Sequence, residues 1–198
     1  MSQANFVNPQ KKMLLFCGPS GSGKTTIVHY MLAKDMRLKF SVSASTRQKR
    51  NNEVDGKDYH FISADEFRKK ISEDEFVEWE QVYENGYYGT LHSEVDRVLG
   101  EGKVPVFDLD VVGGLSIKKQ FGNNVLSVFV RPPDITALKQ RLIARATETE
   151  EDLKKRLEKA TSELTYADRF DKVLLNINKE EACSKAEKWV NEFLNKQL

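Results

Sequence analysis

The chain has 198 residues, enough for one compact domain with a substantial core and room for small inserted subdomains. Lysine and arginine total 31 against 30 aspartates and glutamates, which argues against a nucleic-acid-binding protein and an acidic tail. Two cysteines are too few for a disulfide framework. The first twelve residues are polar and the next apolar run is short, so we expect neither a signal peptide nor a membrane span. We therefore expect a cytoplasmic protein without nucleic-acid or membrane partners.

A strand, a glycine-rich turn and a helix follow one another near the start of the chain. The apolar run Met13–Cys17 leads into Gly18–Thr25, which has the G-x-x-x-x-G-K-[ST] spacing, and a helix is expected from Lys24 to Lys34. Glycines let backbone N–H groups surround a polyphosphate, and the helix N-terminus adds positive potential. A Gly/Ser turn would match this spacing by chance in roughly one such chain in a hundred. The flanking elements favour a phosphate-binding loop, with Lys24 on the β/γ-phosphates and Thr25 on Mg²⁺.

Residues 41–92 differ in character from the segments on either side. Residues 44–58 are polar and turn-rich without helical or strand periodicity, and such long runs inside a domain are usually functional or disordered. We predict a small α+β insert here. Its expected elements are a strand over 40–43, a helix from a Ser63–Glu66 capping box to about Ile71, a hairpin of strand 76–83 and Tyr87-Tyr88 turning at Asn85-Gly86, and a helix over 92–99.

Apolar runs alternate with helical segments in the second half of the chain. This alternation predicts an α/β fold with a parallel sheet flanked by helices on both faces. The expected strands cover 104–108, 125–130 and 172–176, and the expected helices begin near Gly113, cover 135–145, begin near Thr147 and cover 180–196.

Polar groups at strand and helix ends supply further candidates. Asp108 follows a buried strand and is a Walker-B-like candidate for the magnesium shell, although it could instead cap the next turn. Five arginines form two groups that could serve donor and acceptor phosphates, because guanidinium forks fit phosphate, although a solvated charged face is the usual meaning of such spacing. Tyrosines near the insert could be core residues or could contact phosphate or base. The arginines are Arg47, Arg50, Arg141, Arg145 and Arg156, and the tyrosines are Tyr59, Tyr87 and Tyr88.

Nine segments occur in an order that covers nearly the whole chain from Met13 onward. They are Gly18–Thr25, Phe40–Ser43 with Thr46-Arg47 and Arg50, Glu53–Tyr59, Phe76-Val77-Glu78-Trp79, Tyr87–Thr90, Asp108-Leu109-Asp110, Arg141-Leu142 with Arg145, Thr147–Glu151, and Asp171-Lys172-Val173. Together they resemble guanylate kinase.

The resemblance implies a role for each matching residue. The acceptor phosphate and its surroundings fall to Ser43, Arg47, Arg50 and Tyr59. Guanine recognition falls to Glu78, Thr90 and Asp110, with Tyr88, Gly89 and Asp108 completing the acceptor site. ATP binding falls to Gly18, Pro19, Ser20, Gly21, Ser22, Gly23, Lys24, Thr25, Thr26, Arg141, Arg145 and Asn176. The residues acting on the transferred group are Lys24, Arg50, Arg145 and Arg156, and Mg²⁺ is held by Thr25 and Asp108.

The resemblance also implies an activity and a domain plan. We expect an ATP:GMP phosphotransferase that uses ATP and Mg²⁺, forms ADP and GDP, accepts dGMP, and is a monomer or a dimer. The expected single domain over 1–198 has a core of 13–40, 93–140 and 168–198, a GMP-binding insert at 41–92 and a helical lid at about 141–167.

Four residues depart from the family's usual pattern, and two other functions remain open. The departures bear on loop stiffness and lid rates; they are Val112, Ala146, Lys49 and Asn52. Guanylate-kinase-like scaffold domains bind peptides and lack the intact loop, whereas Gly18–Thr25 is complete here. A kinase for another nucleoside monophosphate is the second alternative, and Glu78 argues against it.

Overall fold

The computed structural model describes residues 11–51, 53–143 and 150–196. The chain divides into two compact units. The loop unit comprises Met1–Met36 and Asp108–Leu198, and the insert unit comprises Arg37–Phe107. Among the described residues, no helix is both long and apolar enough to cross a membrane.

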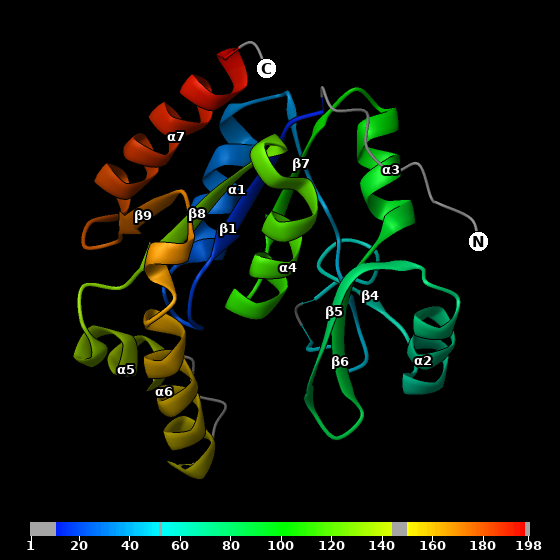
Figure 1. Cartoon of the computed structure of the whole chain (residues 1–198). Coiled ribbons are helices and arrows are strands. Elements are labelled where there is room, and N and C mark those ends of the chain that lie inside the picture. Colours follow the sequence, from blue (N-terminus) through cyan, green and yellow to red (C-terminus); the bar gives the residue numbers. More distant parts are fainter. Residues whose placement is uncertain (1–10, 52, 144–149, 197–198) are drawn as a thin grey trace. The chain divides into compact units, whose positions relative to one another are not determined.

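The loop unit is built on parallel strands. β1 (Met13–Cys17) pairs with β8 (Val125–Arg131), and β8 pairs with β9 (Lys172–Leu175), both in parallel. β1 is buried along its whole length, which fits the apolar run because helices cover such sheets. The helices are α1 (Lys24–Lys34), α4 (Val111–Phe121) and α7 (Lys179–Asn195), all visible in Figure 1. The expected parallel sheet with flanking helices is therefore confirmed.

Close packing brings α4 onto β1. A Cβ atom at Gly114 would overlap the sulfur of Cys17, so only glycine allows the helix to approach this strand so closely. Cys17 is fully buried and forms no disulfide.

Two further helices of the loop unit pack against each other. These are α5 (Ile135–Ile143) and α6 (Glu150–Leu164). The same unit also contains short 3₁₀ turns at Gly122–Asn124 and Ala167–Arg169. Leu138, Leu142 and Ala160 form their buried contact, with Leu153 and Leu157 packed against it. α6 lies within the range expected for a lid, whereas most of α5 lies in the range expected for the core.

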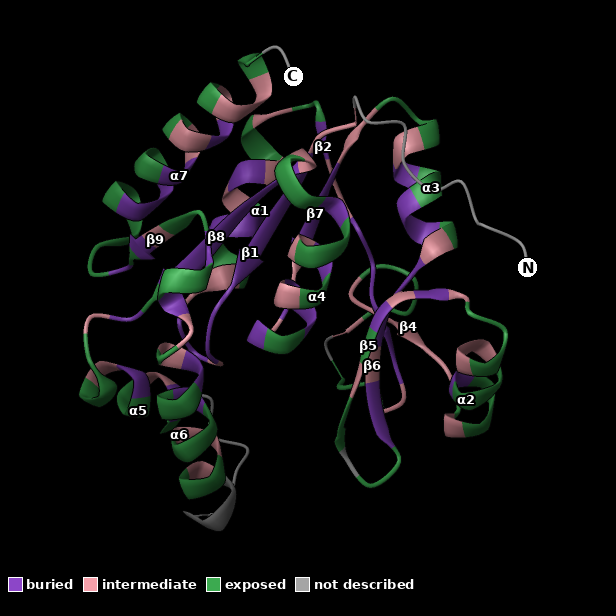
Figure 2. Ribbon diagram, viewed as in Figure 1, coloured by how far each residue is buried: buried purple, intermediate pink, exposed green. Residues whose placement is uncertain are grey.

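The insert unit contains two groups of strands. β2 (Leu38–Phe40) pairs in parallel with β7 (Val104–Asp108), whose last residue belongs to the loop unit. The second group is a sheet in the order β4 (His60–Phe61), β3 (Ala44–Ser45), β6 (Gly86–Leu91) and β5 (Phe76–Tyr83). Its helices are α2 (Ala64–Ser72), capped by Ser63 as expected, and α3 (His92–Gly100). Figure 2 shows buried and exposed residues on α3, whereas Phe67 is the one buried residue of α2.

Two local expectations for the insert were wrong. The strand expected over 40–43 ends at Phe40, which pairs with β7; residues 41–43 lie in no strand, and β3 begins at Ala44, which pairs with β4 and β6. The hairpin turn is shifted by one residue: Gly86 already pairs with Tyr83, and Asn85 supplies the positive φ of 56°. Asparagine tolerates this left-handed conformation better than most residues.

A bulge in the hairpin decides which side chains share a face. Phe76 pairs with Leu91 but Glu78 pairs with Thr90, so Val77 is the extra residue. Phe76 and Leu91 belong to a buried core that also contains Ala44, Phe67 and Tyr87. Because one residue is inserted, Glu78 points to the face opposite Phe76 instead of the same face.

Candidate active site

Two glycines determine the backbone path of the loop between β1 and α1. Gly18 and Gly23 have φ values of 139° and 96°, which side chains disfavour. Space excludes side chains as well, since a Cβ at Gly18 would overlap the Val130 carbonyl oxygen and one at Gly23 would overlap the Asn176 amide nitrogen. The loop therefore follows a path that requires glycine at both positions.

Two polar side chains hold the loop from behind. The buried Asn176 amide donates to the Ser22 carbonyl at 2.7 Å. Arg141 Nη1 lies 3.3 Å from the Ser22 carbonyl oxygen and 3.5 Å from that of Gly21, while Nη2 donates to the Asn176 carbonyl at 3.2 Å. The structure thus brings Arg141 and Asn176 to the loop, but as supports of its carbonyls.

Lys24, the first residue of α1, extends its side chain back to the loop. Lys24 Nζ donates to the Gly18 carbonyl at 2.6 Å and to the Pro19 carbonyl at 3.2 Å. Gly23 occupies the N-cap of α1, and no side chain in the described part of the chain caps it. Uncapped N–H groups, the helix dipole and a lysine that can exchange carbonyls for phosphate are the groups from which an anion site can be built.

The two candidate magnesium ligands lie together. The Thr25 hydroxyl donates to Asp108 Oδ2 at 2.6 Å. The alternative role expected for Asp108 belongs to Asp110, whose Oδ1 accepts from the Gly113 N–H at 3.0 Å as the cap of α4. Mg²⁺ commonly takes one or two protein oxygens beside substrate phosphates, so a hydroxyl and a carboxylate fit it. No cluster of three or more metal-binding side chains occurs among the described residues.

An ion-pair cluster on α6 was missed from the sequence. Lys159 Nζ lies 3.2 Å from Asp110 Oδ2 and 3.7 Å from Glu163 Oε1. Burial raises the pKa of the Glu163 carboxyl. Arg156 lies one turn before Lys159 on the same helix, and the i, i+3 and i, i+4 spacing of these three residues was the available signal. Arg145 and Ala146 lie outside the described residues.

In the insert unit, two acceptor-phosphate candidates, Arg47 and Tyr59, are in contact. Arg47 forms a two-bond ion pair with Glu53, and its guanidinium carbon lies 4.9 Å from the Tyr59 ring centroid. Tyr59 in turn meets Tyr88 edge to face at 6.1 Å. Of the other two acceptor-phosphate candidates, Ser43 is buried and Arg50 is exposed. Sequence reasoning assigned no role to Glu53.

Two of the three guanine candidates, Glu78 and Thr90, form a buried pair on the sheet of the insert unit, whereas Asp110 belongs to the loop unit. The Thr90 hydroxyl donates to Glu78 Oε1 at 2.6 Å, and the two residues are 0% and 8% exposed. The β5–β6 register places Tyr88 on the same face. At Gly89, a Cβ would lie 2.8 Å from both the Glu78 carbonyl and the Phe76 ring, so glycine keeps the strands paired over the core. The result is a carboxylate withdrawn from water beside aromatic and hydroxyl groups.

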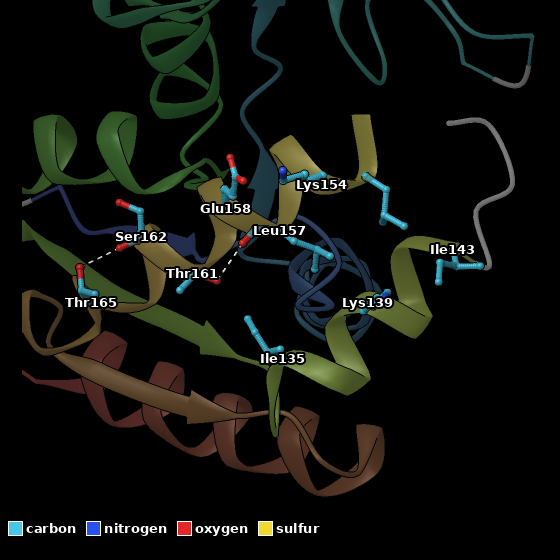
Figure 3. Close-up of a pocket in the computed structure, with 10 residues that line it drawn as sticks. Ile135, Lys139, Ile143, Lys154, Leu157, Glu158, Thr161, Ser162 and Thr165 are labelled. Atoms are coloured by element: carbon cyan, nitrogen blue, oxygen red, sulfur yellow. Dashed lines mark hydrogen bonds between the residues drawn. The ribbon is translucent and has the colours of Figure 1, made fainter. Parts of the chain in front are cut away.

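A separate pocket lies between α5 and α6 (Figure 3). Its lining residues are Ile135, Lys139, Ile143, Leu153, Lys154, Leu157, Glu158, Thr161, Ser162 and Thr165, none of which is a candidate site residue. Thr161 and Thr165 donate to carbonyls of their own helix, at 2.8 and 2.7 Å. We assign this pocket no chemistry, because both of its threonine hydroxyls are engaged within α6 and its immediate end.

Two of the four residues that depart from the family pattern are exposed. Val112 is exposed on α4, and Lys49 is exposed in the loop before Glu53. Asn52 lies outside the described residues.

Comparison with known proteins agrees with this geometry. The guanylate kinase family model matches residues 10–193. A guanylate kinase of Bacteroides fragilis is 48% identical over 185 residues, covering 93% of this chain and 91% of the relative. One from Thermotoga maritima is 45% identical, covering 86% and 82%. The crystal structure of guanylate kinase from Anaplasma phagocytophilum matches with a TM-score of 0.75 at 24% identity over 96% of this chain and 90% of that one, which shows the fold. The chain belongs to the guanylate kinase family.

Proposed function

We propose that this protein transfers the γ-phosphoryl group of ATP to GMP, forming ADP and GDP, and that it also accepts dGMP. The observation that carries the proposal is the buried Glu78 carboxylate held by Thr90. Guanine presents two donors on one edge, N1–H and the N2 amine, which a carboxylate can accept together. Adenine offers an acceptor and a C–H there and would leave the carboxylate unsatisfied.

The donor side binds the triphosphate through the loop. Backbone N–H groups of Gly18–Thr26 surround the phosphates, and Lys24 leaves the Gly18 and Pro19 carbonyls for the β/γ-phosphates. Thr25 and Asp108 would hold Mg²⁺, which would supply positive charge near the phosphate oxygens. Arg141 and Asn176 keep the loop in shape while this happens.

The acceptor side brings an oxygen that needs no general base. The GMP phosphate is already anionic at neutral pH, so catalysis consists mostly of positioning and neutralisation of charge. Arg47, Arg50, Tyr59 and Ser43 hold this phosphate, and Glu78, Thr90 and Asp110 read the base beside Tyr88, Gly89 and Asp108. Arg145 and Arg156 meet the transferring group.

We propose that the core, insert and lid ranges expected from the sequence move as three parts. A site that transfers phosphoryl to GMP can also transfer it to water. Assembly of the arginines only around both nucleotides suppresses that hydrolysis. A cytoplasmic location and a monomeric or dimeric state complete the proposal.

The competing functions lack support from the site. A peptide-binding scaffold domain has no use for the complete loop, for Lys24 held over it, or for Thr25 bonded to Asp108. A kinase for adenylate or a pyrimidine nucleotide has no use for the buried Glu78 carboxylate.

Product analysis tests the reaction. The full chain is incubated with ATP, GMP and Mg²⁺, and the nucleotides are separated by anion-exchange chromatography. We expect ADP and GDP in equal amounts, and little ADP when GMP is omitted or Mg²⁺ is chelated. ADP formed at the same rate without GMP would show a hydrolase and contradict the proposal.

A further inference from the structure

The hydrogen bonds of Arg47 leave one edge of its guanidinium available. Arginine has five N–H groups in a plane. Nη1 donates to Glu53 Oε2 at 2.6 Å and to the Gln48 carbonyl at 3.0 Å, and Nη2 donates to Glu53 Oε1 at 2.5 Å. Glu53 therefore covers the Nη1–Nη2 edge. Within residues 11–51, 53–143 and 150–196, Nε–H and the second Nη2 N–H have no hydrogen-bond acceptor.

Glu53 is itself fixed in place. Its Oε2 accepts from the Arg50 N–H at 2.9 Å, and its own N–H donates to the Arg50 carbonyl at 3.1 Å. The Glu53 and Arg47 side chains are only 12% and 13% exposed. The hydrogen bond from Arg47 lowers the pKa of Glu53 to about 2, so the carboxylate is ionised at neutral pH.

Aromatic rings restrict the guanidinium on other sides. Its carbon lies 4.9 Å from the Tyr59 centroid and 5.3 Å from the Phe61 centroid. Cation–π contacts at these distances are attractive and favour a fixed position of the cation. Carboxylate and rings together hold the Arg47 fork in one orientation.

We infer that Glu53 is a positioning residue that turns the Nε–Nη2 edge of Arg47 toward the phosphate of the acceptor nucleotide. Those two parallel N–H groups match two phosphate oxygens, the bidentate geometry that arginine favours. The inference deepens the proposed function and rests on it, since it assumes that Arg47 meets the GMP phosphate.

The sign of a mutational effect separates positioning from simple charge. If Glu53 only repelled the incoming phosphate, its neutralisation would tighten GMP binding. If Glu53 positions Arg47, neutralisation loosens the fork and weakens GMP binding despite the lost repulsion. A general loss of structure would weaken the binding of guanosine, which has no phosphate, as much as the binding of GMP.

Calorimetric binding of GMP and guanosine to the full chain tests these alternatives, with steady-state kinetics beside it. We expect Glu53→Gln to weaken GMP about tenfold, leave guanosine within about twofold, and raise the GMP KM with kcat within about threefold. In an Arg47→Met background, Glu53→Gln should add less than about a twofold loss, because both act through one contact. Glu73→Gln, which removes an exposed pair with Lys69 on α2, is the matched control and should change nothing.

Three results would overturn the inference: unchanged or tighter GMP binding by Glu53→Gln, an equal loss for guanosine, or full additivity with Arg47→Met. If Glu53→Gln does not fold, Glu53→Asp keeps the charge but shortens the side chain and should show the same selective loss for GMP. A wild-type chain that forms no GDP would instead refute the proposed function, so the two failures are distinguishable.

Discussion

The two units present polar groups in different ways. In the loop unit, the donor site is made of consecutive backbone groups braced by Asn176 and Arg141. In the insert unit, the candidate groups are side chains from separate segments, held by the Arg47–Glu53 and Thr90–Glu78 contacts. Backbone N–H groups suit any polyphosphate, whereas a buried carboxylate suits only a ligand with matching donors. The backbone groups proposed to bind the triphosphate and the Glu78 carboxylate proposed to read guanine therefore lie in different units.

Loss of Lys24 should have the largest effect. Lys24→Ala removes the charge that meets the transferring phosphoryl group, so we expect kcat to fall roughly a hundredfold or more with the fold intact. Steady-state assays and circular dichroism measure the two properties. Lys34→Ala, at the end of α1, is the control. A folded Lys24→Ala variant with near-normal turnover would remove Lys24 from the mechanism.

Neutralisation of Glu78 should alter selectivity rather than chemistry. Glu78→Gln should raise the GMP KM and narrow the preference for GMP over AMP by roughly 2–4 kcal/mol in kcat/KM. Glu80 shares the face of Glu78 by register and is not a neutral control, so the exposed Glu84→Gln serves instead. Discrimination within about threefold of wild type, under 1 kcal/mol, would mean that guanine is read elsewhere.

Loss of the Asn176 hydrogen bond to the loop should affect ATP binding but not the choice of acceptor. Asn176→Ala deletes the 2.7 Å bond to the Ser22 carbonyl, and we expect a loss of about 1–2 kcal/mol in stability. The ATP KM should rise severalfold while the preference among acceptors stays unchanged. Thermal unfolding and kinetics with varied ATP measure these effects. Altered acceptor preference in this variant would contradict the separation between the units.

The Arg47–Glu53 pair should give a small stability effect that depends on pH. The folded-state pKa of Glu53 is about 2, below the ordinary value of 4.5, so its contribution is full above about pH 4.5 and is lost as pH falls toward 2. Wild type should exceed Glu53→Gln in stability by roughly 1 kcal/mol at pH 7. Denaturant unfolding at pH 7, 5, 4 and 3.5 should show a constant difference and then a shrinking one. A difference that grows below pH 4.5 would contradict the assigned pKa.

The donor site was readable from sequence because its groups are contiguous. The spacing of Gly18–Thr25 marked the loop, and the strand end marked Asp108, which lies against Thr25. The α/β alternation likewise predicted the parallel sheet, because buried parallel strands are uniformly apolar.

The acceptor site could not be derived from local pattern. The bulge at Val77 reverses the face that strand alternation assigns to Glu78, so periodicity alone would have grouped it with Phe76. Only the family resemblance pointed to Glu78 and Thr90. Glu53 lies in a polar stretch without periodicity, and its bond to Arg47 depends on loop geometry.

The proposed acceptor site selects guanine. The most direct measurement is kcat/KM for GMP, AMP, UMP and CMP in a coupled assay with saturating ATP and Mg²⁺. We predict kcat/KM for GMP to exceed that for each of the others by about a thousandfold or more, because no other base presents guanine's paired N1–H and N2–H donors to Glu78. Any of the other three within about tenfold of GMP would contradict the claim, since one buried hydrogen-bonded carboxylate should discriminate more strongly than that.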